Sequence, residues 1–209
     1  MVIVCSLYAR GSFIKLALLH FADMNIDKEL IKACIAKKRK AQFQLYKLCY
    51  GILMSVCFRY ENNKEDAEFL LNKAFYKILT KLESYSEQVP FEAWIRRIAI
   101  NTAIDEYRKN QRSKLDFVEE PQQVSPLNQL DYNEADKKFD AEELLNLVKK
   151  LPPASQRVFN LYVIDGFNHK EIAEKLDMSE GTSKWHLSSA RKKLKELMQK
   201  MMNNVALLL

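Results

Sequence analysis

The sequence predicts an all-α protein: two small helical domains joined by an acidic flexible linker, the second containing a helix-turn-helix. The chain of 209 residues has only four glycines and five prolines, too few for the turns of a sheet-rich fold. Apolar residues make up 48% of the chain, enough for a core, and they recur at spacings of three and four, as in amphipathic helices. A stretch rich in acids, proline and amides separates two helical regions.

The first 23 residues form an N-terminal extension that differs from the rest of the chain. They are apolar, but Arg10 and Lys15 interrupt them, so no uncharged run is long enough to cross a membrane. They also lack the order of charge, apolar run and small residues that marks a signal peptide. We therefore expect a cytoplasmic protein. A more ordinary sequence begins at Met24, and the sequence leaves open whether translation starts at Met1 or there.

Residues 24–113 form the first predicted domain. The apolar spacing predicts four helices, two of them within 25–60 and the others at 66–82 and 91–112. Pro90 follows a polar loop and suits the first turn of the last helix.

The second predicted domain covers residues 140–202, after an acidic linker at 114–139 and before a short tail at 203–209. Breaks between its helices are expected at turn-forming residues, namely Leu151-Pro152-Pro153, Asp165-Gly166 and Asp177-Met178-Ser179.

The charge is unevenly distributed along the chain. The net charge is +6, but residues 1–114 carry +8, residues 115–143 carry −7 and residues 144–209 carry +5. Two basic blocks favour a polyanionic partner such as nucleic acid. The four cysteines form no CxxC pair and the three histidines are scattered, so we expect neither a metal nor another cofactor. Because paired carboxylates and glycine-rich phosphate loops are also missing, an enzyme is the least favoured function class.

The segment NHKEIAEKLDMSEGTSKWHLSSARKKLKEL at 168–197 has the length and punctuation of a helix-turn-helix. Asn168 can cap one helix with Glu171 as its reciprocal partner, and Ser179 can cap the next. A buried stripe is predicted on the second helix at Leu187, Ala190, Leu194, Leu197 and Met201. Lys184, Trp185, Ser188 and Lys192 then point the opposite way, as a recognition helix requires. The alternative is an amphipathic surface helix with a solvated basic face.

The helix at 91–112 carries two neighbouring stripes. One is apolar and contains Phe91, Trp94, Ile95, Ile98 and Thr102, and the other contains Arg97, Asn101, Ile104 and Arg108. Arginine and asparagine in a row can contact phosphates and base edges, and Tyr85 and Phe91 would be able to stack on unpaired bases. The competing interpretation is that the apolar stripe belongs to the core and the arginines are solvated.

Taken together, these segments resemble the extracytoplasmic-function group of bacterial RNA polymerase sigma factors. DAEFLLNKAFYKILTKL at 66–82 resembles the core-polymerase-binding helix, and FEAWIRRIAINTAIDEYRK at 91–109 resembles the helix that binds the minus-ten promoter element. Residues 151–194 resemble the C-terminal helix-turn-helix, which binds the minus-thirty-five element. The resemblance implies a transcription initiation factor that binds core polymerase, recognises promoter DNA and assists its melting. It also implies a chain that is monomeric when free of polymerase, an anti-sigma partner and no small-molecule substrate.

The resemblance also implies roles for particular residues. Polymerase binding is assigned to Asp66, Glu68, Asn72 and Phe75, and minus-ten binding to Arg97, Asn101, Asp105 and Arg108. Minus-thirty-five binding is assigned to Thr182, Lys184, Trp185, Ser188, Ser189 and Lys192. The loop at 84–89 lies where the family captures a flipped base. The chain departs from the family pattern at Phe69, where an acid is common, and at Trp185 and Ser189.

A second function class remains open at this stage. A stand-alone helix-turn-helix regulator would bind duplex DNA as a dimer without polymerase, and it would need neither the helix at 66–82 nor the arginine stripe. The two classes differ in whether the protein shifts promoter DNA alone or only together with polymerase.

Overall fold

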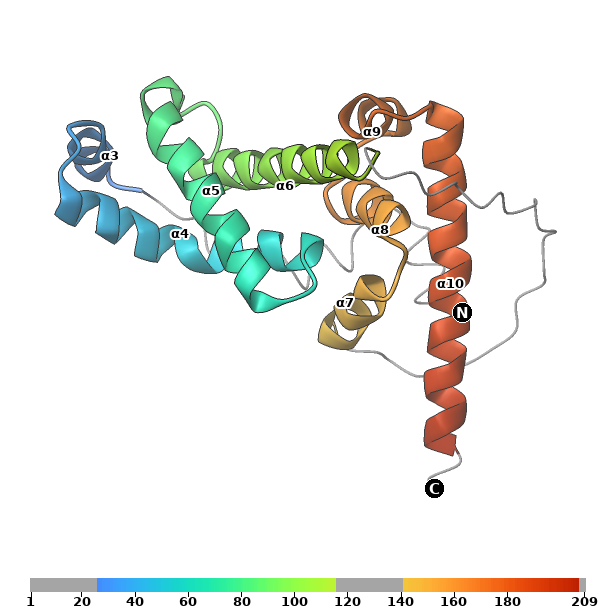
Figure 1. The fold of residues 1–209 in the computed structure, drawn as a ribbon. Coiled ribbons are helices and arrows are strands. Elements are labelled where there is room, and N and C mark those ends of the chain that lie inside the picture. Colours follow the sequence, from blue (N-terminus) through green and yellow to red (C-terminus); the bar gives the residue numbers. More distant parts are fainter. Residues whose placement is uncertain (1–25, 116–140, 207–209) are drawn as a thin grey trace. The chain divides into compact units, whose positions relative to one another are not determined.

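A computed structural model describes residues 26–115 and 141–206, and all regular structure in these two ranges is helical (Figure 1). The prediction of an all-α fold is confirmed. The predicted extension at 1–23 and almost all of the predicted linker at 114–139 lie outside the described residues. None of the helices within the described ranges has the length and apolar character needed to cross a membrane. The chain divides into two compact units between Glu106 and Tyr107, and each unit is described by itself.

The N-terminal unit contains the first three predicted helices and most of the fourth, which continues past the boundary at Glu106. They are α3 (Lys28–Ile35), α4 (Arg39–Tyr60), α5 (Lys64–Lys81) and α6 (Phe91–Leu115), with a 3-10 turn at Leu82–Ser84. Side chains cap two of them. Asp27 accepts a hydrogen bond from the backbone N–H of Glu29 at 3.0 Å, and Asn63 accepts one from that of Asp66 at 2.8 Å. Each cap satisfies a donor that the first turn of a helix leaves without a partner.

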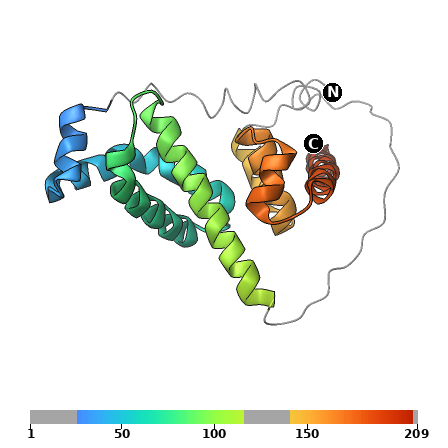
Figure 2. The ribbon, with the colours of Figure 1, turned by 90° about the horizontal axis from the view of Figure 1, so that it is seen from above.

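The core of this unit forms where α4 packs along α5 (Figure 2). The longest helix of the unit, α6, also contributes side chains to this core. Fully buried side chains from all three helices fill it, among them Leu45, Leu53, Leu70, Leu71, Ile78 and Ile95. The apolar stripe of α6 is therefore core, as the competing interpretation held. The sequence pattern predicts Ile104 on the outer stripe beside the arginines, but its side chain is buried at 4% exposure. The middle of α6 is buried on most of its sides, which a single-stripe pattern does not anticipate.

The C-terminal unit consists of α7 (Ala141–Lys149), α8 (Pro153–Phe159), α9 (His169–Leu176) and α10 (Glu180–Ala206). The breaks between its helices fall where the turn-forming residues predicted them. Pro153 begins α8, where its missing N–H has no consequence for helix bonding. After Phe159 the helix widens into one π turn, η2 (Asn160–Ile164). Gly166 follows with φ at +79°, a conformation that suits glycine.

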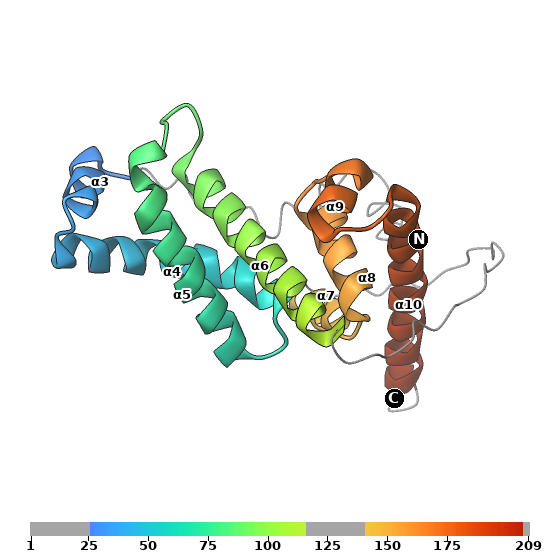
Figure 3. The ribbon, with the colours of Figure 1, turned by 45° about the horizontal axis from the view of Figure 1, so that its top comes forward.

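The helix α10 is the longest helix of this unit and packs against α7, α8 and α9 (Figures 1 and 3). The predicted stripe is buried at Leu187, Ala190 and Leu194 and half-buried at Leu197 and Met201. The helix continues to Ala206, so the first residues of the predicted tail extend α10. The remaining tail residues, 207–209, lie outside the described residues.

The turn between α9 and α10 has the predicted caps. The Asn168 side chain accepts from the Glu171 N–H at 2.9 Å, and the Glu171 carboxylate accepts from the Asn168 N–H at 2.8 Å. Asp177 ends α9 in the left-handed conformation, with φ at 57°. Ser179 Oγ then accepts from the Thr182 N–H at 2.9 Å and begins α10. These contacts set where the second helix starts relative to the first.

Candidate nucleic-acid and polymerase interfaces

The outer face of α10 presents the residues that the sequence assigned to duplex DNA. Thr182, Lys184, Trp185, Ser188 and Lys192 are exposed, and Ser189 is half-buried. Trp185 is 44% exposed and contacts the His186 ring edge-to-face at 4.8 Å between centroids. Lys184 forms an ion pair with Glu180 one turn earlier, at 2.8 Å. The face therefore combines short hydroxyls, cations and one large aromatic ring, groups that serve for base edges, phosphates and contact area.

Two serine–histidine hydrogen bonds connect α10 to the rest of its unit, and no sequence pattern predicts either of them. Ser155 Oγ of α8 lies 3.0 Å from His186 Nδ1, and Ser183 Oγ lies 3.0 Å from His169 Nδ1 of α9. Both serines are buried, and burial lowers the pKa of His186. The two pairs join residues far apart in sequence, so only the packed structure shows them.

The second candidate surface lies on α6. Arg97 and Asp105 are exposed, and Asn101 and Arg108 are half-buried. The Asp105 carboxylate accepts a hydrogen bond from the Lys77 ammonium of α5 at 2.8 Å, and the two groups form an ion pair. Asp105 thus contributes to the attachment of α5 to α6, together with the ion pair between Lys73 and Glu106 at 2.8 Å.

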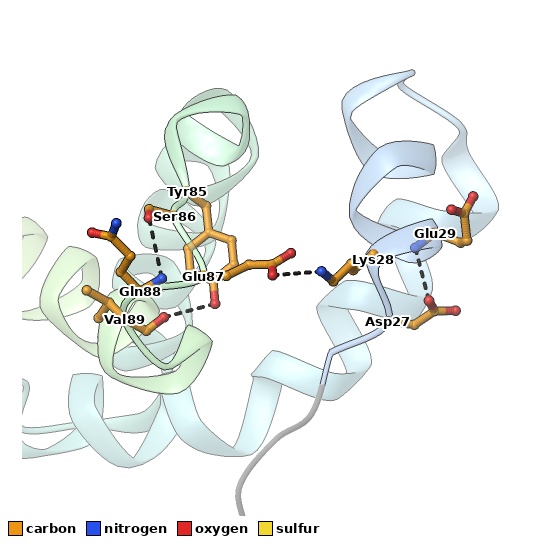
Figure 4. Close-up of polar contacts among 8 residues, drawn as sticks. All are labelled: Asp27, Lys28, Glu29, Tyr85, Ser86, Glu87, Gln88 and Val89. Carbon is orange, nitrogen blue, oxygen red and sulfur yellow. Dashed lines mark hydrogen bonds and ion pairs between the residues drawn. The ribbon is translucent and has the colours of Figure 1, made fainter.

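The loop before α6 is closed by its own hydrogen bonds (Figure 4). The Tyr85 hydroxyl donates to the Val89 carbonyl at 2.9 Å, and the Val89 N–H donates to the Ser86 carbonyl at 3.2 Å. Glu87 forms an ion pair with Lys28 of α3 at 2.7 Å. This leaves the exposed Gln88 and Val89 at the tip. These contacts give the loop a defined shape.

One residue proposed for base stacking is not available for it. Phe91 is 3% exposed, and its ring packs edge-on against Tyr85 at 5.1 Å. Trp94 packs on the same tyrosine at 5.2 Å. Desolvation by this packing raises the pKa of Tyr85, with a smaller contribution from Glu87. The rings of Tyr85, Phe91 and Trp94 pack together beneath the loop. Phe91 is therefore a core residue.

The residues assigned to polymerase binding lie on α5. Asp66 and Asn72 are exposed, and Glu68 is half-buried. Tyrosines of α4 donate to two of them, Tyr50 to Glu68 at 3.3 Å and Tyr46 to Asn72 at 3.1 Å. These hydrogen bonds hold the two polar side chains at the edge between α4 and α5.

The fourth residue assigned to this surface, Phe75, lies in the core instead. It is 8% exposed and packs edge-on against Tyr46 at 5.0 Å. Two aromatic side chains that the sequence analysis did not assign take the outer face of α5, Phe69 at 59% exposure and Tyr76 at 69%. Their spacing of seven residues places them on one side of the helix, and this spacing was readable in the sequence.

The described residues offer no site for a metal ion, since they contain no group of three or more ligating side chains. Cys34, Cys49 and Cys57 are buried free thiols. Burial raises the pKa of Cys49 and of Cys57 to about 12, so both stay protonated and behave as small apolar residues.

Comparison with known families accounts for both units. Residues 45–113 match the family described as Sigma-70 region 2, and residues 141–194 match Sigma-70, region 4. The first match contains α5 and all but the last two residues of α6, and the second contains the helix-turn-helix. The two matches together cover more than half of the chain. The chain belongs to the sigma-70 family, in its extracytoplasmic-function group.

Curated relatives of this sigma factor agree with that assignment. The RNA polymerase sigma factor SigZ of Bacillus subtilis is 28% identical over 66% of this chain and 76% of its own. The ECF RNA polymerase sigma factor SigW of the same organism is 26% identical over 73% of this chain and 82% of its own. Among solved structures, RpoE from Bartonella quintana, in complex with the anti-sigma factor NepR, is 21% identical with a TM-score of 0.44. The alignment with this RpoE structure covers 75% of the present chain and 95% of the RpoE chain.

The family membership favours the initiation factor over the stand-alone regulator. This sigma factor directs RNA polymerase to promoters in transcription initiation, and sigma factors are initiation factors without an enzymatic activity of their own. The stand-alone regulator is therefore the less supported alternative, because the region 2 match contains the two helices that such a regulator does not need.

Proposed function

We propose that the two units divide promoter recognition between duplex and melted DNA. In this proposal residues 140–202 dock on the minus-thirty-five duplex through α10, and residues 24–113 bind core polymerase and the minus-ten element. The observation that carries the proposal is the outer face of α10, where Trp185 and five hydroxyl or basic side chains are grouped on one side of a helix whose other side is buried. A helix of this kind fits the major groove.

The minus-ten part of the proposal rests on α6 and the loop before it. Arg97, Asn101 and Arg108 lie on α6, next to a loop whose exposed tip is held by Lys28 and Tyr85. Melted DNA offers unpaired bases, which need contacts besides phosphate neutralisation. We infer that the arginines bind the strand and that the loop at 84–89 receives a flipped base at its exposed tip. Because Asp105 is paired with Lys77, we assign it to positioning α6.

For polymerase binding we propose the exposed side of α5. Asp66, Glu68 and Asn72 supply its polar edge, and Phe69 and Tyr76 supply exposed aromatic area. Exposed aromatics of this size are typical of protein interfaces. The family also leads us to expect an anti-sigma protein, and we place the chain in the cytoplasm, where core polymerase acts.

The first experiment asks whether initiation depends on this chain. Run-off transcription with core polymerase on genomic promoter fragments should yield specific transcripts only when the sigma factor is added. Mobility-shift assays on the same fragments should show a promoter-specific complex that requires polymerase. A specific shift by the chain alone, with no effect on transcription, would favour the stand-alone regulator.

The second experiment separates the two units. Arg97→Ala or Asn101→Ala should permit closed-complex formation but impair opening, measured by permanganate footprinting with core polymerase. A premelted promoter bubble should restore much of the open complex. Lys184→Ala should weaken initial binding and gain little from the bubble. Lys32→Ala is the matched control, since it removes one charge from the N-terminal unit at a lysine paired with Glu29 on α3. Equal rescue of both kinds of variant, or of neither, would contradict the division of labour.

A further inference from the structure

A cluster of side chains lies where η2, α9 and α10 meet, beside the proposed duplex-binding face. The Tyr162 and His169 rings are stacked, with centroids 4.5 Å apart and planes inclined by 25°. The Arg191 guanidinium lies 6.0 Å from the centroid of the Tyr162 ring. His169 Nδ1 is hydrogen-bonded to Ser183 Oγ at 3.0 Å, and Ser183 is fully buried. The imidazole is therefore held in one orientation by a stack and a hydrogen bond.

The charges around His169 come mainly from α10. Partial burial lowers the pKa of His169 first, and the positive charges of Lys184 and Arg191 lower it further. Glu180 acts in the opposite direction, but its carboxylate is paired with Lys184 at 2.8 Å. Lys170, next to His169 on α9, lowers the pKa of Glu180 and so helps to keep that carboxylate ionised. The free protein consequently carries a neutral imidazole among cations at neutral pH.

An anion close to this cluster would shift the protonation equilibrium of His169. Its negative charge would favour the protonated imidazole, and the neighbouring cations would bind the anion directly. The first helix of a helix-turn-helix crosses the DNA backbone while the second enters the groove. His169 begins that first helix, and Lys184, whose positive charge acts on His169, also lies on the proposed groove face. The anion that meets such a position is a phosphodiester of the duplex.

We propose that Tyr162, His169 and Arg191 bind a backbone phosphate at the edge of the groove, and that His169 takes up a proton from solvent when they do. This inference rests on the proposed docking of α10 on duplex DNA, and it adds a phosphate site with a pH dependence. Tyr162, 36% exposed, stacks on the imidazole and carries a hydroxyl that can donate to an anion. By linkage, DNA binding that takes up a proton becomes tighter as the pH falls.

The test measures duplex affinity against pH and salt. The full-length chain is titrated into a fluorescein-labelled, mixed-sequence DNA duplex, with anisotropy read from about pH 8 to about pH 5.5, where histidine titrates. The affinity should rise by up to about tenfold per pH unit over part of this range, the limit for uptake of one proton. The slope of log affinity against log salt should also become steeper at the acidic end, by up to about 0.9, because one more phosphate is neutralised.

Two variants test whether His169 causes the pH dependence of the duplex affinity. His169→Gln keeps hydrogen-bonding capacity at this position but does not titrate, so its affinity should no longer rise on acidification. The matched control is His186→Gln, which removes a histidine that is also hydrogen-bonded to a buried serine but lies outside the cluster. It should keep the wild-type rise. Circular dichroism at each pH verifies that every variant is folded. If His169→Gln does not fold, NMR titration of the wild-type His169 ring replaces it, and the pKa should rise when duplex is added.

The outcomes separate this inference from the proposed function. Salt-dependent duplex binding with the same pH dependence in wild type and His169→Gln would overturn the phosphate site and leave duplex docking intact. A ring pKa that does not rise with bound duplex would have the same meaning. Failure of the wild-type chain to bind duplex at low salt, both alone and with core polymerase, would contradict the docking role itself and the phosphate site with it.

Discussion

Replacing Ala190 by aspartate should unfold the helix-turn-helix unit. Ala190 has no exposed surface and lies between the buried Leu187 and Leu194 on the inner stripe of α10. A buried charge without a partner costs about 3–5 kcal/mol. The extra atoms of aspartate in a filled position cost about 1–3 kcal/mol more. The total of about 4–8 kcal/mol is comparable with the whole stability of a domain, about 5–15 kcal/mol.

Circular dichroism and limited proteolysis together measure this effect. The variant should lose helical signal and gain cleavage sites within 141–206, while 39–106 stays resistant. Ser188→Asp is the matched control, because it adds the same charge to the same helix at an exposed position and should melt like the wild type. The penalty should decrease as the pH falls, since a protonated aspartate is less costly to bury. Wild-type melting of Ala190→Asp at neutral pH would refute the helix phase on which the DNA-binding face depends.

Three further predictions concern the same unit. Trp185→Ala should weaken promoter binding by about 1–3 kcal/mol in anisotropy titrations, with an unchanged circular dichroism spectrum because the ring is 44% exposed; an unfolded variant would show that the ring is core. Asp177→Val should lower the unfolding free energy by about 1–2 kcal/mol at this left-handed position, and Asp177→Gly should not. Burial lowers the pKa of His186, so the unfolded chain binds the proton more readily, and stability is lost on acidification through the histidine range. Melting curves of His186→Gln should show a smaller loss of stability on acidification than those of the wild type. The same dependence of stability on pH in both proteins would contradict this role of His186.

Sequence patterning determined where the helices lie and where α9 and α10 begin, because these features depend on local chemistry. Asn168, Glu171 and Ser179 are caps whose partners lie three residues away, so their roles follow from spacing alone. The exposed side of α10 was predictable for a related reason. Leu187, Ala190 and Leu194 determine one face of a helix, and the opposite face is then fixed by its period.

Only the tertiary structure decided which residues lie beneath a neighbouring helix and which distant side chains meet. Phe75 is apolar at a position that the family pattern places on a binding helix, but contact with Tyr46 of α4 buries it, while Phe69 and Tyr76 stay outside. Asp105 lies on the arginine side of α6, yet its carboxylate is paired with Lys77. Ser183 and His169 meet only because the turn brings α9 against α10. The helix period specifies the angle at which a side chain leaves the axis of its helix. Burial and pairing depend in addition on how far a second helix extends over that side chain, which is a property of the packed chain.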